Sequence, residues 1–295
     1  MKKLYIAIAS ASALAATSSF AAGVDNKTDG LTLDVSSKVE VAYTKSEVKD
    51  SDATLDTNNI DLNVEASYTA ASGVKAFSVF KTEFLSPSTS YVGIGYMDSE
   101  LTVGNHALGS DNFGIGQDFD FGVGNALGKT SGTDVIKASY SNSGITLIAS
   151  ADIAEGDADE SALDVYGSYE TSGITVAATL QSQKENSNAD SMTYFGISGK
   201  YVMDAITAGA EFTYDSDGKN MAYEVAGAYA ATDMMTVAAG FGQMIYDDST
   251  MDTLSQYYVN ASYKLVDNAA VYAELGGDSD DNTDLAYTAG MYVKF

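Results

Sequence analysis

The feature that most constrains the fold of this chain is an alternation of apolar and polar residues that returns along nearly its whole length. Between Ile60 and Ser67 the even positions are apolar, and the odd positions carry Asp61, Asn63 and Glu65. A period of two residues is typical of a β-strand with two different faces. Stripes with a helical period are scarce, so the alternation favours an all-β fold.

A second pattern divides the chain into repeats, each marked by a tyrosine, a short turn and a new strand. These tyrosines lie between 28 and 44 residues apart, at Tyr68, Tyr96, Tyr140, Tyr169, Tyr201, Tyr229 and Tyr263. Phe295 falls where the next aromatic residue of the series is due. Each repeat holds a strand, a polar loop and a returning strand, so the pattern predicts 16 antiparallel strands.

One repeat is longer than the others and predicts a single oversized loop, at about residues 106–132. Sixteen strands in one sheet must curl, split or close. An even strand number, short turns at one end with longer loops at the other, and a ring of tyrosines at one rim favour closure as a transmembrane β-barrel. The alternation alone also allows a secreted β-sandwich or propeller.

The start of the chain is typical of a protein exported from the cytoplasm. Two lysines follow Met1, an apolar stretch comes next, and small residues precede a cut after Ala21. This pattern predicts a signal peptide over residues 1–21 and a β-barrel domain over residues 22–295. No later run of roughly 18 apolar residues predicts a helical membrane span. The single proline, Pro87, is expected in a loop, because a closed sheet uses every backbone N–H.

Composition excludes several classes of function. Asp and Glu number 41 against 15 basic residues, a net charge of −26 that disfavours nucleic acid as a partner. Cysteine is absent and His106 is the single histidine, so zinc sites of the His/Cys type are not expected. With no recognisable nucleophile beside His106 we expect no catalytic residues, no cofactor and no bound metal.

At this point the sequence resembles the general diffusion porins, a family of trimeric barrels in the outer membrane of Gram-negative bacteria. The resemblance is most specific over residues 90–95 with 101–105, over 114–122, and over 134–140. It implies a 16-stranded barrel whose third long loop folds into the pore. It also implies a homotrimer in contact with the lipid bilayer and lipopolysaccharide. The last residues of this chain, Met291, Val293 and Phe295, resemble the signal that the barrel-assembly machinery reads in that family.

The resemblance also implies a pore constriction formed by charged residues. Its acidic side would be Asp111, Asp118 and Asp120 on the oversized loop. Its basic side would be Lys38, Lys81 and Lys137 on the strands. The expected remaining pore-lining residues are Glu40, Asp61, Glu65, Asn105 and His106. The family usually has an arginine where this chain has Asn105 and His106, and arginine is absent here. The alternative for the acidic residues is a solvated external loop, and the alternative for the lysines is a role in solubility at the ends of strands.

These features predict a channel for passive diffusion of small hydrophilic solutes and ions, with a preference for cations. An alternative is a channel selective for sugars or organic ions, in which Tyr166, Tyr194, Tyr258 and Tyr272 would stack against the solute. A structural barrel, an adhesin and an enzymatic barrel are further alternatives. The acidic run over residues 278–284 suits calcium or loose divalent bridging to lipopolysaccharide, or it is a solvated loop.

Overall fold

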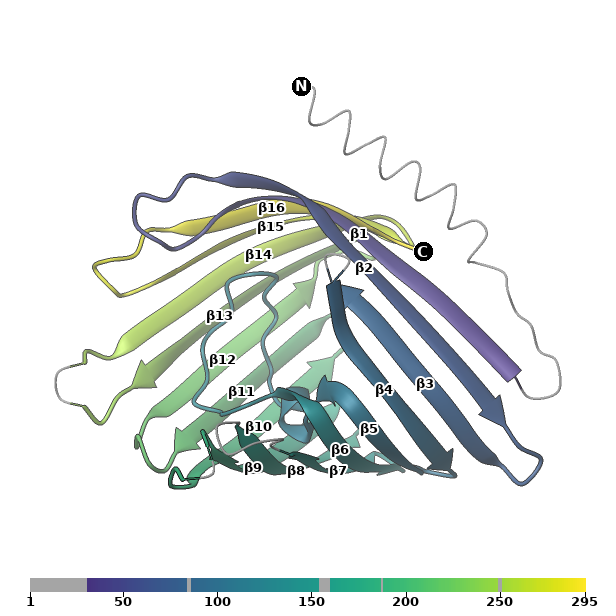
Figure 1. Ribbon diagram of the computed structural model, residues 1–295. Helices are drawn as coiled ribbons and strands as arrows, with labels where there is room; N and C mark the ends of the chain where they lie inside the picture. Colours follow the sequence, from purple (N-terminus) through teal and green to yellow (C-terminus); the bar gives the residue numbers. More distant parts are fainter. Residues whose placement is uncertain (1–30, 84–85, 154–159, 187, 249–250) are drawn as a thin grey trace.

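The chain forms a closed barrel of 16 antiparallel strands, as the repeat predicts (Figure 1). The computed structural model describes residues 31–83, 86–153, 160–186, 188–248 and 251–295. The expected signal peptide lies outside the described residues. The strands are β1 (Leu31–Lys45), β2 (Thr54–Thr69), β3 (Val74–Glu83), β4 (Ser86–Tyr96), β5 (Ser99–Ala107), β6 (Ser131–Asn142), β7 (Ile145–Asp152), β8 (Ser161–Thr171), β9 (Ile174–Lys184), β10 (Met192–Met203), β11 (Ile206–Asp215), β12 (Met221–Ala230), β13 (Met235–Ile245), β14 (Leu254–Val266), β15 (Ala269–Asp278) and β16 (Ala286–Lys294).

The barrel closes where the first strand pairs with the last. β1 and β16 run antiparallel, with Lys38 opposite Lys294 and Tyr43 opposite Ala289. Beyond the end of β16, the Phe295 N–H donates to the Ser37 carbonyl at 2.8 Å, and the Ser37 N–H donates back to the Phe295 carbonyl at 3.0 Å. Phe295 therefore adds a final backbone pair to the closing seam, which removes the free edges that an open sheet would expose.

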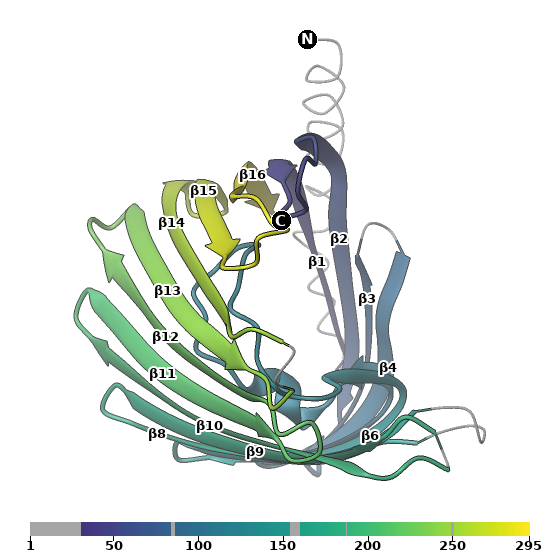
Figure 2. The same cartoon turned by 90° about the vertical axis from the view of Figure 1, so that its left-hand side faces the viewer.

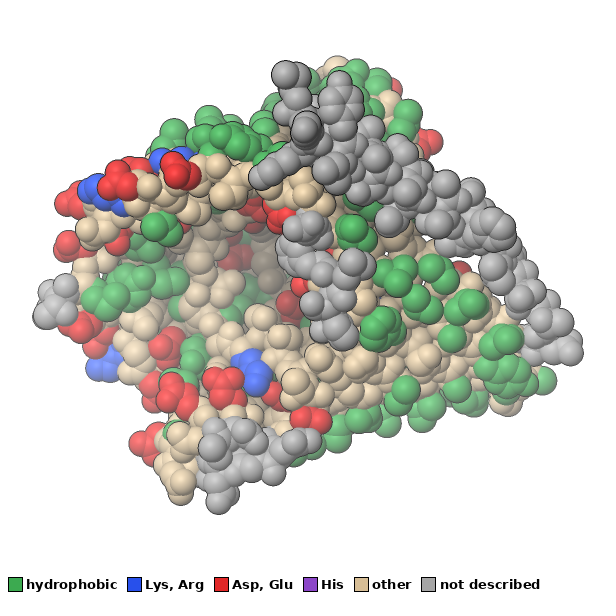
Figure 3. Space-filling view, turned by 45° about the horizontal axis from the view of Figure 1, so that its top comes forward, with side chains coloured by type: hydrophobic (Ala, Val, Ile, Leu, Met, Phe, Trp, Pro, Cys, Tyr) green, Lys and Arg blue, Asp and Glu red, His purple; other side chains and the backbone are tan. Residues whose placement is uncertain are grey.

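The two faces of the strands have the predicted characters. Exposed apolar side chains cover the outer wall, and acidic and lysine side chains gather at one end around a hollow opening (Figure 3). The described residues form small apolar clusters inside the barrel, such as Phe113 with Ile148 and Tyr166. Among the described residues, no helix has the length and apolar character needed to cross a membrane.

The short turns explain why the tyrosines fall at one rim. Ser143 and Gly144 have φ values of 53° and 83°, and Ser172 and Gly173 have 47° and 82°. Two successive residues with positive φ form the hairpin turn whose twist matches the strands that it joins. Each repeat tyrosine from Tyr68 to Tyr263 lies within a few residues of a short turn between two strands, and these tyrosines are 41–51% exposed. The expected aromatic rim is therefore present.

Two details differ from the expectations. The oversized loop covers residues 108–130 because β5 extends to Ala107 and β6 begins at Ser131. Pro87 is not in a loop but is the second residue of β4, opposite Thr82. The pairing of β3 with β4 shifts register between Lys81 and Thr82, and such an irregularity near a strand start tolerates a missing N–H.

Candidate functional site

Residues 108–130, which we call the inward loop, lie inside the barrel (Figure 2). The loop starts with a short 3-10 helix, η1 (Gly109–Asn112), which contacts β7, β8 and β9. It then crosses the inner wall as far as β15, where Phe121 lies against the backbone of Gly276. On the way back, Val123 lies against Gly242 of β13. These contacts place the inward loop against the inner wall of the barrel.

Acidic side chains of the wall hold the outgoing half of the loop. The Asp164 carboxylate accepts the N–H groups of Gly109 at 3.2 Å and Ser110 at 2.6 Å. The Glu211 carboxylate accepts the N–H of Ile115 at 3.0 Å. A loop has no strand partner for its N–H groups, so each needs an acceptor from elsewhere. Inward carboxylates supply those acceptors here.

The tip of the loop is held by one carboxylate. Glu274 of β15 accepts three successive N–H groups, from Phe119 at 2.7 Å, Asp120 at 2.9 Å and Phe121 at 2.7 Å. Asn260 of β14 donates to the same carboxylate at 2.9 Å. Successive N–H groups that converge on one anion form a backbone nest. The nest fixes the height of the tip in the lumen.

Neutral side chains and one lysine hold the returning half. Thr213 Oγ1 accepts the N–H of Ala126 at 2.8 Å, and Gln183 accepts the N–H of Lys129 at 3.0 Å. The Lys129 ammonium forms ion pairs with Asp152 at 2.8 Å and with Glu160 at 3.2 Å. These carboxylates raise the pKa of Lys129 despite the opposing effect of its burial, which is the largest single influence. The lysine therefore stays charged at the root of the loop.

The loop covers many inward residues of the wall that it crosses. Asp164, Glu211, Glu224 and Glu274 are between 1% and 8% exposed. The alternation that predicts inward acids such as Glu65 carries no sign that a loop covers these four. The four candidate stacking tyrosines, Tyr166, Tyr194, Tyr258 and Tyr272, are likewise only 2–9% exposed. They do not form an accessible aromatic track.

A cavity of about 540 Å³ remains between the loop tip and the opposite wall. Asp120 and Phe119 border it from the loop, and Lys38 and Glu40 border it from β1. The Lys38 ammonium lies 2.6 Å from the Glu40 carboxylate, which also accepts from Asn59 at 3.1 Å. The structure thus brings Asp120 of the expected acidic side to the same cavity as Lys38 of the expected basic side.

Asp118 occupies a different place from Asp120, although both are at the tip. Its carboxylate lies beside the backbone of Gly116 and Gly122, where an added Cβ would meet its oxygens at 2.7 and 2.8 Å. Burial raises the pKa of Asp118, and the nearby charges of Glu274 and Asp120 raise it further, against a backbone hydrogen bond that lowers it. Glycine at both positions leaves room for this folded-back carboxylate.

The other expected constriction residues gather at the root of the loop. Lys137 of β6 donates to the Ala107 carbonyl at 2.9 Å and interacts electrostatically with Asp111 and Lys81. Burial raises the pKa of Asp111, and the charge of Lys137 partly opposes that rise. The six expected residues therefore form two groups, one at the tip of the loop and one at its root.

His106 and Asn105 differ from the pore-lining expectation. His106 is 4% exposed, stacks on Tyr91 with ring centroids 4.4 Å apart, and lies 3.1 Å from Thr102 Oγ1. Asn105 lies on the outer face of β5, because it follows Val103 by two residues and Val103, which pairs with Val92, points outward. The register shift between Gly104 and His106 adds the extra residue to β6, so β5 keeps its alternation and His106 points inward like Thr102.

Glu65 and Asp61 lie on the inner face of β2, away from the loop. The Glu65 carboxylate accepts from the Lys75 ammonium at 3.0 Å, and about a third of each side chain is exposed, 32% and 35%. Asp61 is opposite Lys38 in the pairing of β1 with β2. Both residues therefore belong to the part of the wall that the inward loop leaves uncovered.

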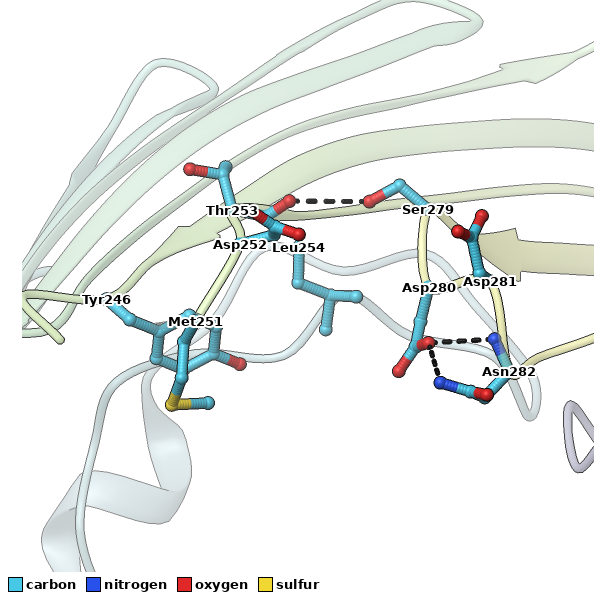
Figure 4. Close-up of a pocket in the computed structure, with 9 residues that line it drawn as sticks. All are labelled: Tyr246, Met251, Asp252, Thr253, Leu254, Ser279, Asp280, Asp281 and Asn282. Atoms are coloured by element: carbon cyan, nitrogen blue, oxygen red, sulfur yellow. Dashed lines mark hydrogen bonds between the residues drawn. The ribbon is translucent and has the colours of Figure 1, made fainter. Parts of the chain in front are cut away.

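A second pocket, of about 410 Å³, lies among the outer loops (Figure 4). Ser279 donates to the Thr253 carbonyl at 3.4 Å, and the Asp280 carboxylate accepts from the backbone and side chain of Asn282 at 2.8 and 2.9 Å. Asp284 pairs with Lys45 at 2.9 Å, and this hydrogen bond is the main cause of the lowered pKa of Asp284. Part of this acidic run thus bonds within the loops themselves.

Comparison with known proteins places this geometry in context. A family model described as Gram-negative porin matches residues 9–283. Porin-like protein H of Photobacterium profundum is 28% identical over 332 residues, which cover all of both chains. OmpT, an outer membrane protein of Vibrio cholerae, has a TM-score of 0.81 at 17% identity over 91% of this chain and 99% of that one. An anion-selective porin from Comamonas acidovorans has a TM-score of 0.74 at 14% identity, covering 90% of this chain and 100% of its own.

Proposed function

The chain belongs to the Gram-negative porin family, and we propose that it forms an outer-membrane channel for passive diffusion of small hydrophilic solutes, with a preference for cations. Family membership and the closed barrel support an outer-membrane porin channel. The course of the inward loop supports the finer statement, because the loop narrows the lumen to the cavity beside Asp120. Solutes would cross by diffusion, without a catalytic step.

The charge around that cavity is the observation that carries the cation preference. Among the residues that the structure describes, Lys38 is the one basic residue that borders it, against Glu40, Asp56 and Asp120. Glu40 already neutralises Lys38 at 2.6 Å. A cavity with an acidic surplus and low-dielectric walls concentrates cations and repels anions. The net charge of the whole chain, −26, has the same sign.

The test is a reversal potential across a planar lipid bilayer under a KCl gradient. At a mean salt of about 0.1 M the Debye length is roughly 10 Å, so the wall charges reach the permeating ion. At about 1 M it falls to roughly 3 Å, and the preference for K⁺ should shrink. An anion-selective reversal potential at low salt would show that the lysines control permeation, and it would overturn the cation preference.

The remaining expectations about assembly are also part of the proposal. A trimer form is known for the Vibrio cholerae OmpT structure, which shares the fold at 16% identity. We expect this chain to form homotrimers in contact with lipopolysaccharide, after cleavage of the predicted signal peptide. Chemical crosslinking of the purified protein at increasing dilution checks the trimer, and a single monomer band throughout would contradict it.

Phe295 is the expected signal for the barrel-assembly machinery. Its backbone pairs with Ser37 at the closing seam, so it ends the strand that completes the barrel. Replacing Phe295 with Asp should block membrane insertion and leave export intact. Fractionation of cells that produce the variant measures both steps. Normal outer-membrane levels of the variant would remove Phe295 from this role.

The alternative of a sugar-selective channel finds less support. Its candidate tyrosines, Tyr166, Tyr194, Tyr258 and Tyr272, lie beneath the inward loop and are at most 9% exposed. Stacking against a sugar ring needs an accessible aromatic face in the lumen. The channel that the geometry supports best therefore selects by charge and size.

A further inference from the structure

One aromatic side chain of the inward loop is exposed to the lumen, whereas the wall tyrosines Tyr166, Tyr194, Tyr258 and Tyr272 are covered. Phe119 is 40% exposed at the tip of the loop. Tyr272 stacks against it with ring centroids 4.6 Å apart and an angle of 30° between the rings. The rest of the phenylalanine borders the cavity of about 540 Å³. An apolar ring held beside a cavity with several charged lining residues needs a reason, since burial elsewhere would be more favourable.

The ring is fixed in place rather than free to collapse onto the wall. The Phe119 N–H and its two successors donate to Glu274, whose own exposure is 1%. Phe121, on the other side of Asp120, lies against Gly276, where no larger residue would fit because an added Cβ would lie 2.4 Å from the phenylalanine. The loop thus presents a preorganised aromatic surface, which lowers the entropic cost of binding a ligand there.

The charges beside the ring are acidic. The next residue, Asp120, is exposed in the cavity and makes no ion pair within the described part of the chain. Lys38 across the cavity is paired with Glu40, so its charge is compensated. A cation over an aromatic face is attracted by the ring quadrupole, and a neighbouring carboxylate adds to that attraction. An anion would meet Asp120 and Glu40 instead.

From these observations we propose that the cavity is a binding subsite for organic cations that carry a flat or apolar group, with Phe119 contacting that group and Asp120 contacting the positive charge. The inference rests on the proposed function and names the solute class for which the pore has most affinity. Such solutes pause at the tip of the loop, so they reduce the current carried by K⁺ while they are bound.

The test is block of the K⁺ current in a planar bilayer by three probes: benzyltrimethylammonium, tetramethylammonium and benzoate. Benzyltrimethylammonium has a ring and a positive charge, tetramethylammonium has the positive charge without the ring, and benzoate has a ring with a negative charge. Benzyltrimethylammonium should have an apparent dissociation constant about fivefold lower than tetramethylammonium, a factor typical of one aromatic ring pair. Benzoate should block least. Equal block by the two cations, or stronger block by benzoate, would overturn the subsite.

Variants assign the effect to the two residues. Phe119→Ala should bring the two cations to nearly equal affinity, and Asp120→Asn should weaken both by a similar factor. Phe241→Ala is the matched control, because Phe241 is also 40% exposed but faces outward on β13. An unchanged advantage of the benzyl cation in Phe119→Ala would refute the role of the ring. A protein that conducts no current at all would instead refute the proposed channel, so the two failures are distinguishable.

Discussion

Two arcs of the same barrel wall carry the same sequence pattern and have different roles. The covered arc is the wall of β7–β15, which the inward loop crosses, and the open arc is that of β1–β4 and β16. Inward acids of the covered arc, such as Glu274 at 1% exposure, are used as acceptors for loop N–H groups. In the open arc, Glu65 keeps 32% of its side chain exposed. An inward charge thus acts on permeating ions directly only where nothing covers it.

The covered arc also determines where the open lumen lies. The loop fills the space against the covered arc and reaches from β8 to β15 before it returns. The lumen that remains borders β1 and β2, where Lys38, Glu40 and Asn59 lie. We therefore expect substitutions in the covered arc to change mainly stability and substitutions in the open arc to change mainly permeation.

The largest effect is expected from Glu274→Ala in the covered arc. It removes the acceptor of three loop N–H groups and should lower the free energy of unfolding by about 3 kcal/mol, since charge-assisted hydrogen bonds are among the strongest. The released tip should also raise single-channel conductance. Urea titration in detergent, followed by circular dichroism, and bilayer recording measure the two effects.

Glu65→Ala in the open arc is the matched control. It removes an ion pair with Lys75 in which about a third of each side chain is exposed, and it should change the free energy of unfolding by less than about 1 kcal/mol. Equal destabilisation by the two variants would break the distinction between the arcs.

A second pair of variants should separate stability from selectivity. Asp164→Asn weakens the acceptor of the Gly109 and Ser110 N–H groups and should cost about 2 kcal/mol of unfolding free energy. Asp120→Asn should leave stability unchanged and move the reversal potential under a KCl gradient toward zero. If Asp164→Asn shifted the reversal potential more than Asp120→Asn did, covered charges would govern permeation.

A smaller effect is expected where one neutral acceptor is lost. Thr213 is 1% exposed, and its Oγ1 accepts the Ala126 N–H at 2.8 Å. Thr213→Val keeps the shape but leaves that N–H without its partner, at a cost of about 1 kcal/mol. Thr54→Val in the open arc, where Thr54 borders the cavity, should change urea midpoints hardly at all. Similar midpoints for both variants would argue against a structural role for the loop contacts.

The smallest effect concerns pH. Burial is the main cause of the raised pKa of Asp118, with Glu274 and Asp120 adding to the rise. A carboxylate with a raised pKa takes up its proton earlier as the pH falls, so it loses its negative charge at a higher pH than an ordinary aspartate. Cation preference should therefore begin to decline at a higher pH in the wild type than in Asp118→Asn. Superimposable pH profiles of the reversal potential would remove Asp118 from the site.

Much of the fold could be predicted because it depends on short-range patterns. The alternation around Asp61 and Glu65 assigned the two faces of β2, and the tyrosine repeat gave the number of strands and the position of the short turns. Both follow from the period of two residues in a strand and from turn chemistry, which neighbouring residues determine. The unusual length of one interval was enough to single out the inward loop.

The local exceptions were harder to predict. Alternation along β5 places Asn105 on the outer face and His106 on the inner face, but no local pattern indicates that His106 stacks on Tyr91 and is buried there. Likewise, Gly116 and Gly122 make room for the Asp118 carboxylate, but their spacing does not say that Asp118 folds back while Asp120 faces the cavity.

What the sequence by itself determined is the barrel: its strands, their faces, its aromatic rim and its acidic character. Only the tertiary structure decided which inward groups line water and which hold the loop. Phe119 and Glu274, for example, are 155 residues apart in the chain and meet through one hydrogen bond at the loop tip. The alternation states that a side chain points inward, but not what lies against it, because that depends on where a distant segment packs.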